Sequence, residues 1–170
     1  DLYHSLIGRR IGLSILDDDE NVGTVLADPS QIQQVLTNIL VNAKEAIQPD
    51  AEGEIKLSIH SDRVKGSEIS PDLAPGLYVR LDVKDNGVGM NPEQQARCFE
   101  PFFTTKNTDQ ATGVGLAGSG LGLSTAYSLV RQHDGIITVQ SCPGEGTIVS
   151  VYLPMFSGAV SSSGERDGVF

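Results

Sequence analysis

The clearest hydrophobic pattern in the chain is a set of apolar residues at helical spacing after Asp28. Asp28 is a good N-cap, Pro29 suits the first helical position, and Gln31 follows three residues after the cap. We therefore predict a long amphipathic helix that ends at Gln48-Pro49-Asp50. The residues expected on its core face are Ile32, Val35, Leu36, Ile39, Leu40, Ala43 and Ile47.

Alternating apolar and polar residues predict β-strands elsewhere, each with one buried face. The predicted strands lie at residues 10–16, 22–27, 55–59, 77–83, 135–140 and 147–153. An acidic turn at residues 17–21 separates the first two strands, and a polar loop at residues 65–76 separates the middle two. The turn at residues 143–146 joins the last two strands, so they form a closing pair.

The rest of the chain divides into two helices, a loop and a tail. A short helix is expected from Asn91-Pro92-Glu93 to about Cys98, and a longer one at residues 121–133. Residues 100–120 have no periodicity and predict a loop, while the Ser/Gly-rich residues 157–170 predict a flexible tail or linker. We therefore expect one domain at residues 10–156, preceded at residues 1–9 by the end of an upstream helical domain or a linker.

Composition narrows the class of protein. A length of 170 residues fits one domain with a real core, and a net charge of −10 argues against a non-specific nucleic-acid or membrane surface. No apolar run approaches transmembrane length and no signal peptide is present, so we expect a cytoplasmic domain. The chain begins without Met, and we expect it to be a piece of a longer protein. Cys98 and Cys142 lack metal-ligand spacing and are expected to be reduced and buried.

Three polar residues share one stripe of the first predicted helix. Asn38, Asn42 and Glu45 are spaced i, i+4 and i+7. Asparagine is a poor helix former, so two of them inside a helix need a reason. One interpretation is a solvated polar face. The other is that the amide oxygen of Asn42 binds a Mg²⁺ ion that also takes phosphate oxygens and water, since Mg²⁺ uses few protein ligands beside a nucleotide.

The segment Asp85-Asn86-Gly87-Val88-Gly89 ends a predicted strand. Asp85 continues the alternation of Leu81 and Val83, so its carboxylate is expected to point inward, where it needs hydrogen-bond donors. The 6-amino group of adenine is a suitable donor, and Gly87 and Gly89 allow the backbone to approach a base closely. The alternative is an ordinary turn, because Asp-Asn-Gly is a common turn sequence.

The predicted loop at residues 100–120 carries aromatic, cationic and glycine residues. Three phenylalanines at or just before its start, Phe99, Phe102 and Phe103, either belong to the core or hinge a lid. Lys106 either meets a phosphate as a point charge or is solvated. Residues 113–118 match the dinucleotide pattern G-x-G-x-x-G, but no buried strand precedes them, so we reject that interpretation. The glycines do precede the helix at 121–133, whose first backbone N–H groups are suited to hold phosphates.

Four segments in this order resemble the N, G1, F and G2 boxes of the catalytic domain of sensor histidine kinases. They lie at residues 38–43, 85–90, 99–106 and 118–123. This domain belongs to the fold shared by gyrase B, the heat-shock chaperone ATPases and the mismatch-repair ATPases. The resemblance covers about residues 10–154, Gly146-Thr147 matches the last short motif of the fold, and the details are closest to the nitrogen-regulation and hybrid kinases.

The resemblance implies an α+β fold, a two-layer sandwich of a mixed, mostly antiparallel sheet with helices on one face and ATP under a glycine-rich lid. It implies Asn38, Asn42 and Lys106 as catalytic residues, with Asn42 as the Mg²⁺ ligand. The residues it implies around ATP are Asn42, Glu45, Asp85, Gly87, Gly89, Phe103, Thr105, Lys106, Gly118, Ser119, Gly120, Leu121, Gly122, Leu123 and Thr147. Many family members carry a cation and then an aromatic residue where this chain has Glu45 and Ala46.

The family transfers the γ-phosphate of ATP to a histidine on its own dimerisation domain, for relay to the receiver domain of a response regulator. The resemblance thus implies a homodimeric parent, soluble or membrane-anchored, and a monomeric isolated domain. His4, His60 and His133 are isolated and do not resemble an acceptor motif. The alternative is an ATPase switch of the same fold, but that class places a glutamate base where this chain has Asn38, which cannot accept a proton. A third possibility is a degenerate nucleotide-binding module, which the intact Asn42 and Asp85 disfavour.

Overall fold

The structure of the protein is a computed structural model that describes residues 6–7, 11–17, 22–65, 69–104 and 120–156. The predicted tail at residues 157–170 and most of the predicted N-terminal segment lie outside the described residues. Within the described residues, no helix is long and apolar enough to cross a membrane.

Five strands form one mixed sheet in the order β1-β2-β3-β5-β4. Their bounds are β1 (Ile11–Asp17), β2 (Gly53–Val64), β3 (Gly76–Asp85), β4 (Ile136–Cys142) and β5 (Gly146–Pro154). β1 pairs with β2 in parallel, and the other three pairs are antiparallel. The strand predicted at residues 22–27 is wrong, because that segment makes only an isolated bridge between Val25 and Met155. The other predicted strands are confirmed, and β2 extends further than its alternation indicated.

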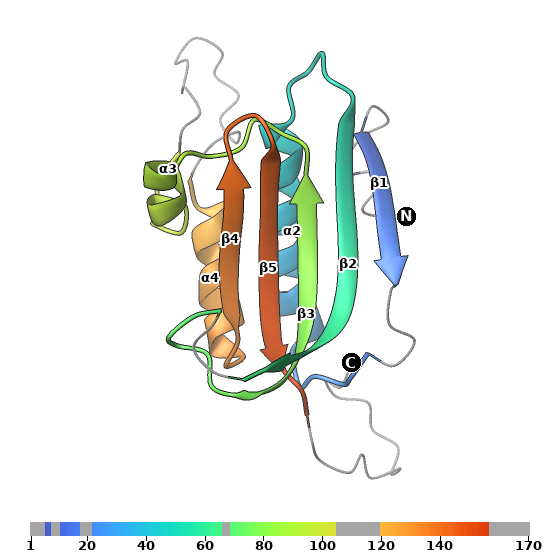
Figure 1. The fold of residues 1–170 in the computed structure, drawn as a ribbon, viewed down its shortest axis with the longest axis vertical. Helices are drawn as coiled ribbons and strands as arrows, with labels where there is room; N and C mark the ends of the chain where they lie inside the picture. The colour runs from blue at the N-terminus through green and yellow to red at the C-terminus, as the bar shows by residue number, and fades with distance from the viewer. Residues whose placement is uncertain (1–5, 8–10, 18–21, 66–68, 105–119, 157–170) are drawn as a thin grey trace.

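Two helices, α2 (Pro29–Ala46) and α4 (Gly122–Gln132), cover one face of the sheet, while the short α3 (Pro92–Arg97) lies beyond the β4 edge (Figure 1). α2 begins as predicted, because the Asp28 side chain accepts hydrogen bonds from the backbone N–H groups of Ser30 and Gln31. α3 begins with a reciprocal pair of hydrogen bonds between Asn91 and Gln94. The two-layer α+β sandwich is therefore confirmed.

The main core lies between α2, α4 and the face of the sheet that carries the odd-numbered residues of β2, β3, β4 and β5. Its fully buried side chains include Val35, Ile39, Leu40, Ile55, Val83, Ala126, Val130 and Val151. A smaller cluster lies on the opposite face and consists of Val64, Leu73, Tyr78, Ile136 and Tyr152. Strand alternation places the two clusters on opposite faces of the sheet. Asp85, the odd-numbered polar residue that ends β3, therefore points toward the helices.

The two cysteines are both free but differ in exposure. Cys98 is 7% exposed, and burial raises the pKa of its thiol to about 11. Cys142 is exposed at the end of β4. The prediction that both are buried is therefore wrong for Cys142, because an edge strand leaves its last residue open to solvent.

Candidate functional site

The carboxylate of Asp85 is buried at the end of β3, with only 3% of the residue exposed. Its Oδ1 accepts a hydrogen bond from the backbone N–H of Gly87 at 2.8 Å, and the backbone N–H of Thr147 also donates to the carboxylate. Burial raises the pKa of Asp85, and the two backbone donors offset part of that rise. The inward direction is confirmed. An ordinary turn accounts for the bond to Gly87 but not for burial of the carboxylate.

The glycines after Asp85 are required by the approach of other backbone segments. A Cβ on Gly87 would lie 2.6 Å from the carbonyl oxygen of Ala46, at the end of α2. Gly89 has φ +67°, and a Cβ there would overlap the carbonyl oxygen of Cys142. The turn is thus held between α2 and the β4–β5 turn. Two hydrogen bonds fix it, from Val88 N–H to the Ala46 carbonyl at 3.0 Å and from Gly144 N–H to the Val88 carbonyl at 2.8 Å.

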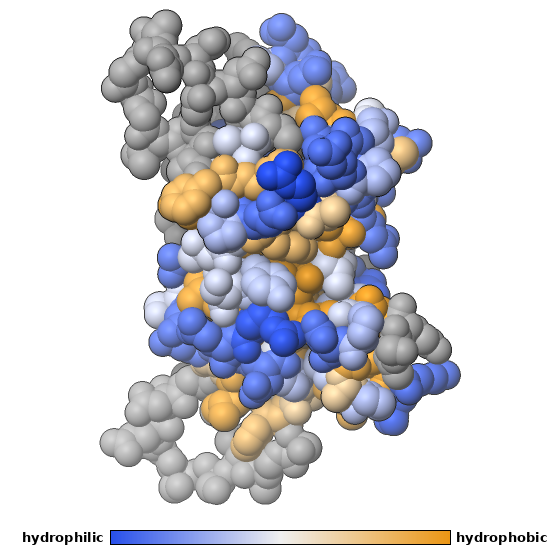
Figure 2. Space-filling model, turned by 90° about the vertical axis from the view of Figure 1, so that its left-hand side faces the viewer, coloured by the Kyte–Doolittle hydropathy of each residue, from blue (hydrophilic) through white to orange (hydrophobic). Residues whose placement is uncertain are grey.

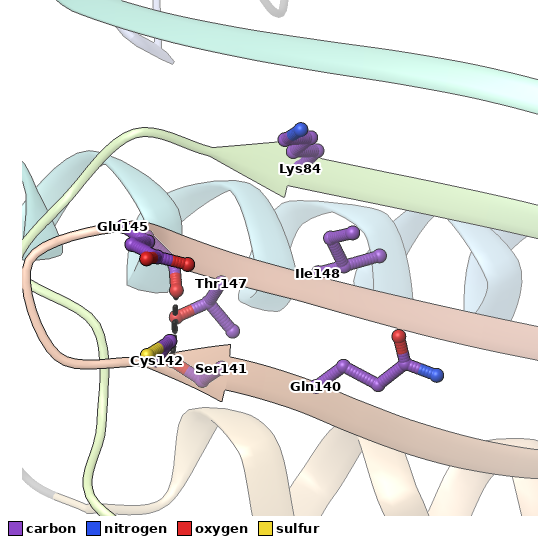
Figure 3. Close-up of a pocket in the computed structure, with 8 residues that line it drawn as sticks. Lys84, Gln140, Ser141, Cys142, Glu145, Thr147 and Ile148 are labelled. Atoms are coloured by element: carbon purple, nitrogen blue, oxygen red, sulfur yellow. Dashed lines mark hydrogen bonds between the residues drawn. The ribbon is translucent and has the colours of Figure 1, made fainter.

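Thr147 lies directly opposite Asp85 in the pairing of β3 with β5, and only 5% of it is exposed. Its hydroxyl lies 2.9 Å from the hydroxyl of Ser141, the residue opposite Thr147 on β4 (Figure 3). Asp85, Thr147 and Ser141 thus form a polar row across three strands at one end of the sheet. The predicted association of Thr147 with Asp85 is supported by this register.

Sequence reasoning missed two residues of this end of the sheet, Ser141 and Gln95. The Gln95 side chain of α3 donates to the carbonyl of Ser141 at 2.9 Å and accepts from its N–H at 3.2 Å. The available signal for Ser141 was a polar residue at an inward position after Ile137 and Val139. Gln95 had no such signal, because its partner Ser141 lies 46 residues away in sequence.

The helical stripe of Asn38, Asn42 and Glu45 lies on α2 as predicted, with both asparagines half-buried and Glu45 exposed. The start of α4 lies against this part of α2, since a Cβ on Gly122 would be 3.9 Å from the carbonyl oxygen of Asn38. Leu121 is exposed, whereas the Leu123 side chain belongs to the core. The stripe and the start of α4 are therefore neighbours.

The loop before α4 is closed at its base. Phe102 N–H donates to the Gly120 carbonyl at 3.0 Å, and Gly120 has φ +66° with no room for a Cβ beside Phe102. Thr105, Lys106, Gly118 and Ser119, all predicted around the phosphates, lie outside the described residues.

The three phenylalanines have different environments. The Phe99 ring packs 5.5 Å from that of Tyr127, and the Arg97 guanidinium lies 4.5 Å above the Phe103 ring. Phe102 is 74% exposed, so it does not belong to the core. Figure 2 shows the side of the molecule with α3, α4 and the β4 edge, where apolar and polar side chains interleave. The interpretation that these phenylalanines belong to the core therefore holds for Phe99 and not for Phe102.

A shallow pocket of about 290 Å³ borders the same end of the sheet (Figure 3). Lys84, Gln140 and Ile148 line it, together with Ser141, Thr147 and the residues Cys142, Glu145 and Gly146 of the β4–β5 turn. Lys84, Gln140 and Ile148 lie on the face of the sheet away from α2 and α4, and Asp85 is not among the lining residues. The buried Asp85 carboxylate and the polar row, rather than this pocket, mark the candidate site.

The sandwich has a buried carboxylate at the end of a central strand, with glycine turns around it. A glycine-preceded helix lies beside a stripe of asparagines. Together these features define an ATP-binding domain of the type found in kinases and ATPases. The sequence matches the family described as histidine kinase-, DNA gyrase B- and HSP90-like ATPase over residues 27–157, and the chain belongs to this family.

Curated relatives include sensor kinases. The sensory histidine kinase/phosphatase NtrB of Escherichia coli O157:H7 is 37% identical over 149 residues, which is 83% of this chain and 36% of NtrB. The sensor kinase CckA of Brucella abortus (strain 2308) is 32% identical over 157 residues, which is 90% of this chain and 15% of CckA. The chain therefore spans about a third or less of these relatives and is homologous to their ATP-binding catalytic domain.

Solved structures show the same fold. The nucleotide-free catalytic domain of the histidine kinase ThkA superimposes with a TM-score of 0.60 at 27% identity, covering 91% of this chain and 83% of that one. Full-length ShkA in complex with AMPPNP gives a TM-score of 0.65 at 26% identity, covering 94% of this chain and 28% of that one.

Proposed function

We propose that this chain binds Mg-ATP at the Asp85 end of the sheet and is the catalytic half of a protein-histidine kinase. The observation that carries the proposal is the buried Asp85 carboxylate, which accepts from Gly87 N–H through Oδ1 and lies opposite Thr147 on β5. A buried carboxylate is stabilised by a donor, and the adenine 6-amino group supplies one. The homology to NtrB and the AMPPNP complex of ShkA support this assignment.

The phosphates are proposed to lie at the start of α4. No side chain caps this end of α4 among the described residues, so its first backbone N–H groups are available to an anion. These N–H groups and the helix dipole favour negative charge at this position. The exposed Leu121 and the small Gly122 leave the backbone open there, next to the Asn38 turn of α2.

Asn42 is proposed as the protein ligand of Mg²⁺. No group of three or more His, Cys, Asp or Glu in the described part of the chain is arranged to hold a metal. A half-buried amide oxygen beside phosphates fits an ion that keeps most of its ligands from water and nucleotide. When bound, the ion neutralises charge on the β- and γ-phosphates. Lys106 is proposed to add a further positive charge.

The phosphoryl acceptor is proposed to be a histidine on a dimerisation domain, with a response-regulator receiver domain downstream. The two described histidines are committed to other contacts. His133 accepts from the Asp28 N–H through Nε2 at 3.2 Å, while its Nδ1 lies 2.8 Å from the Leu129 carbonyl. His60 lies with Ser58 and Asp82 on the face of the sheet away from the helices. The parent protein is proposed to be a homodimer with this domain in the cytoplasm.

Transfer in trans tests the proposal. Phosphoryl transfer depends on an in-line nucleophile near the γ-phosphate, and the side chain one turn before Asn42 is Asn38, which cannot activate water. The chain alone should bind Mg-ATP, hydrolyse it very slowly and not label itself. Addition of the parent's dimerisation domain and [γ-³²P]ATP should yield an acid-labile, base-stable label on that partner. Rapid hydrolysis by the isolated chain would instead favour the ATPase switch.

A further inference from the structure

Ser141 joins three segments of the chain around the polar row at the end of the sheet. Its Oγ lies 2.8 Å from the backbone N of Met90, 2.9 Å from the carbonyl oxygen of Gly146 and 2.9 Å from Oγ1 of Thr147. Figure 3 shows Ser141 and Thr147 side by side on β4 and β5. The Ser141 hydroxyl therefore contacts the turn after Asp85, the β4–β5 turn and the one buried hydroxyl opposite Asp85.

The direction of these bonds follows from the number of protons. A hydroxyl has one proton and two lone pairs, a backbone N–H only donates, and a carbonyl only accepts. Met90 thus donates to Ser141. If all three bonds form together, Ser141 donates to the Gly146 carbonyl, and the remaining bond is donated by Thr147 to Ser141. The single proton of Thr147 is then used within the protein.

As a consequence, the proposed base site has a hydrogen-bond acceptor on each side, the Asp85 carboxylate and the Thr147 hydroxyl. The Thr147 hydroxyl presents only lone pairs, and the Asp85 carboxylate is already an acceptor. We infer that Ser141 is a specificity-determining positioning residue, which takes the Thr147 proton and thereby favours a 6-aminopurine over a 6-oxopurine. The inference rests on the proposed function, because it requires a base to bind with its 6-substituent against both Asp85 and Thr147.

Gln95 holds Ser141 in the position that this role needs. Its Nε2 donates to the carbonyls of Ser141 at 2.9 Å and Met90 at 3.2 Å, and its Oε1 accepts from the Ser141 N–H at 3.2 Å. Because β4 is the edge strand of the described sheet, these backbone groups of Ser141 have no partner among the described strands on that side. Gln95 replaces the missing strand, so Ser141 and Met90 keep a fixed separation.

The test is the relative affinity of the 170-residue chain for Mg-ATP and Mg-ITP, measured by calorimetry. ITP carries a carbonyl where ATP carries the 6-amino group, and an N1–H where ATP has a lone pair. Ser141→Ala releases the Thr147 proton, which can then donate to that carbonyl. We expect the preference for ATP over ITP to fall by about 2- to 12-fold, the range of one net hydrogen bond. Ser141→Thr retains the hydroxyl and should restore the preference.

The same substitution made in a Thr147→Val variant distinguishes this role from a general destabilisation of the fold. In Thr147→Val no hydroxyl proton remains to be redirected, so adding Ser141→Ala should not change the ratio of the two affinities further. An unchanged ratio in Ser141→Ala, or an equal shift in the Thr147→Val background, would overturn the inference while the proposed function stands. A wild-type chain that binds no ATP would refute the proposed function and the inference with it.

Discussion

Substitution of Asp85 by asparagine tests base recognition most directly. The carboxylate offers two acceptor oxygens, and Gly87 N–H occupies Oδ1 at 2.8 Å. If the asparagine carbonyl keeps that bond, its NH₂ group replaces the other oxygen and faces the adenine amine, so two donors oppose each other. The variant loses a hydrogen bond to a charged, buried group, worth about 2–3 kcal/mol. We therefore expect the Kd for Mg-ATP to rise about 30- to 150-fold.

Calorimetry of wild type and variant measures this effect, and Asp82→Asn is the matched control. The Asp82→Asn substitution removes the same charge from the same strand. Asp82 lies on the opposite face of the sheet, where its carboxylate pairs with the Arg80 guanidinium at 2.9 Å. Asp82→Asn should leave the affinity for ATP unchanged. Equal affinities for wild type and Asp85→Asn, in a variant that melts normally, would show that Asp85 does not contact the base.

The pH dependence provides a second readout of the same carboxylate. Burial raises the pKa of Asp85 above its ordinary value of 3.8, and only the ionised form accepts fully from the adenine amine. As the pH falls through this raised pKa, the wild type should lose ATP affinity. Asp85→Asn has no proton to gain, so the difference between the two proteins should shrink toward low pH. A difference that stays constant down to the lowest pH at which both proteins remain folded would contradict a role for the carboxylate charge.

Three further outcomes are expected. Asn42→Ala should abolish the part of the ATP affinity that depends on Mg²⁺ while the melting temperature stays within a few degrees of wild type, and titrations with and without EDTA measure this. Ile39→Ala should destabilise the fold by about 2–5 kcal/mol in urea unfolding, because Ile39 is 1% exposed between α2 and the sheet, whereas Gln34→Ala on the exposed side of α2 should have little effect. Iodoacetamide should modify Cys142 in the native chain and Cys98 only after unfolding, since Cys98 is buried with a pKa of about 11, and mass spectrometry of peptides distinguishes the two.

The elements that depend on local signals were predictable from the sequence. α2 begins and ends close to the predicted bounds because its cap, its proline and its apolar spacing all lie within the helix. The alternation before Asp85 also predicted an inward carboxylate correctly. Residues 22–27 show where local alternation fails. A strand needs a neighbour to pair with, and this segment meets only Met155.

The arrangement of the site required knowledge of the register between distant segments. Thr147 faces Asp85 only because β5 inserts between β3 and β4, and Gln95 reaches Ser141 across 46 residues of sequence. Gly87 and Gly89 were predicted for their closeness to a base, and the structure shows that α2 and the β4–β5 turn already require them. These relations are properties of packing, and no pattern within one element contains them.

The two halves of the proposed site differ in how they are held. The base half consists of strand residues, Asp85, Thr147 and Ser141, whose positions are fixed by backbone pairing on three strands. The phosphate half consists of the Asn42 stripe on α2 and the uncapped start of α4, which meet through helix packing. A change in how α4 packs against α2 would move the start of α4 relative to Asn42, while Val88 keeps the turn after Asp85 bonded to Ala46 of α2. Under the proposed function, such a division would allow the nucleotide to remain bound by its base while the γ-phosphate is aligned with an acceptor on another domain, because alignment rather than affinity limits phosphoryl transfer.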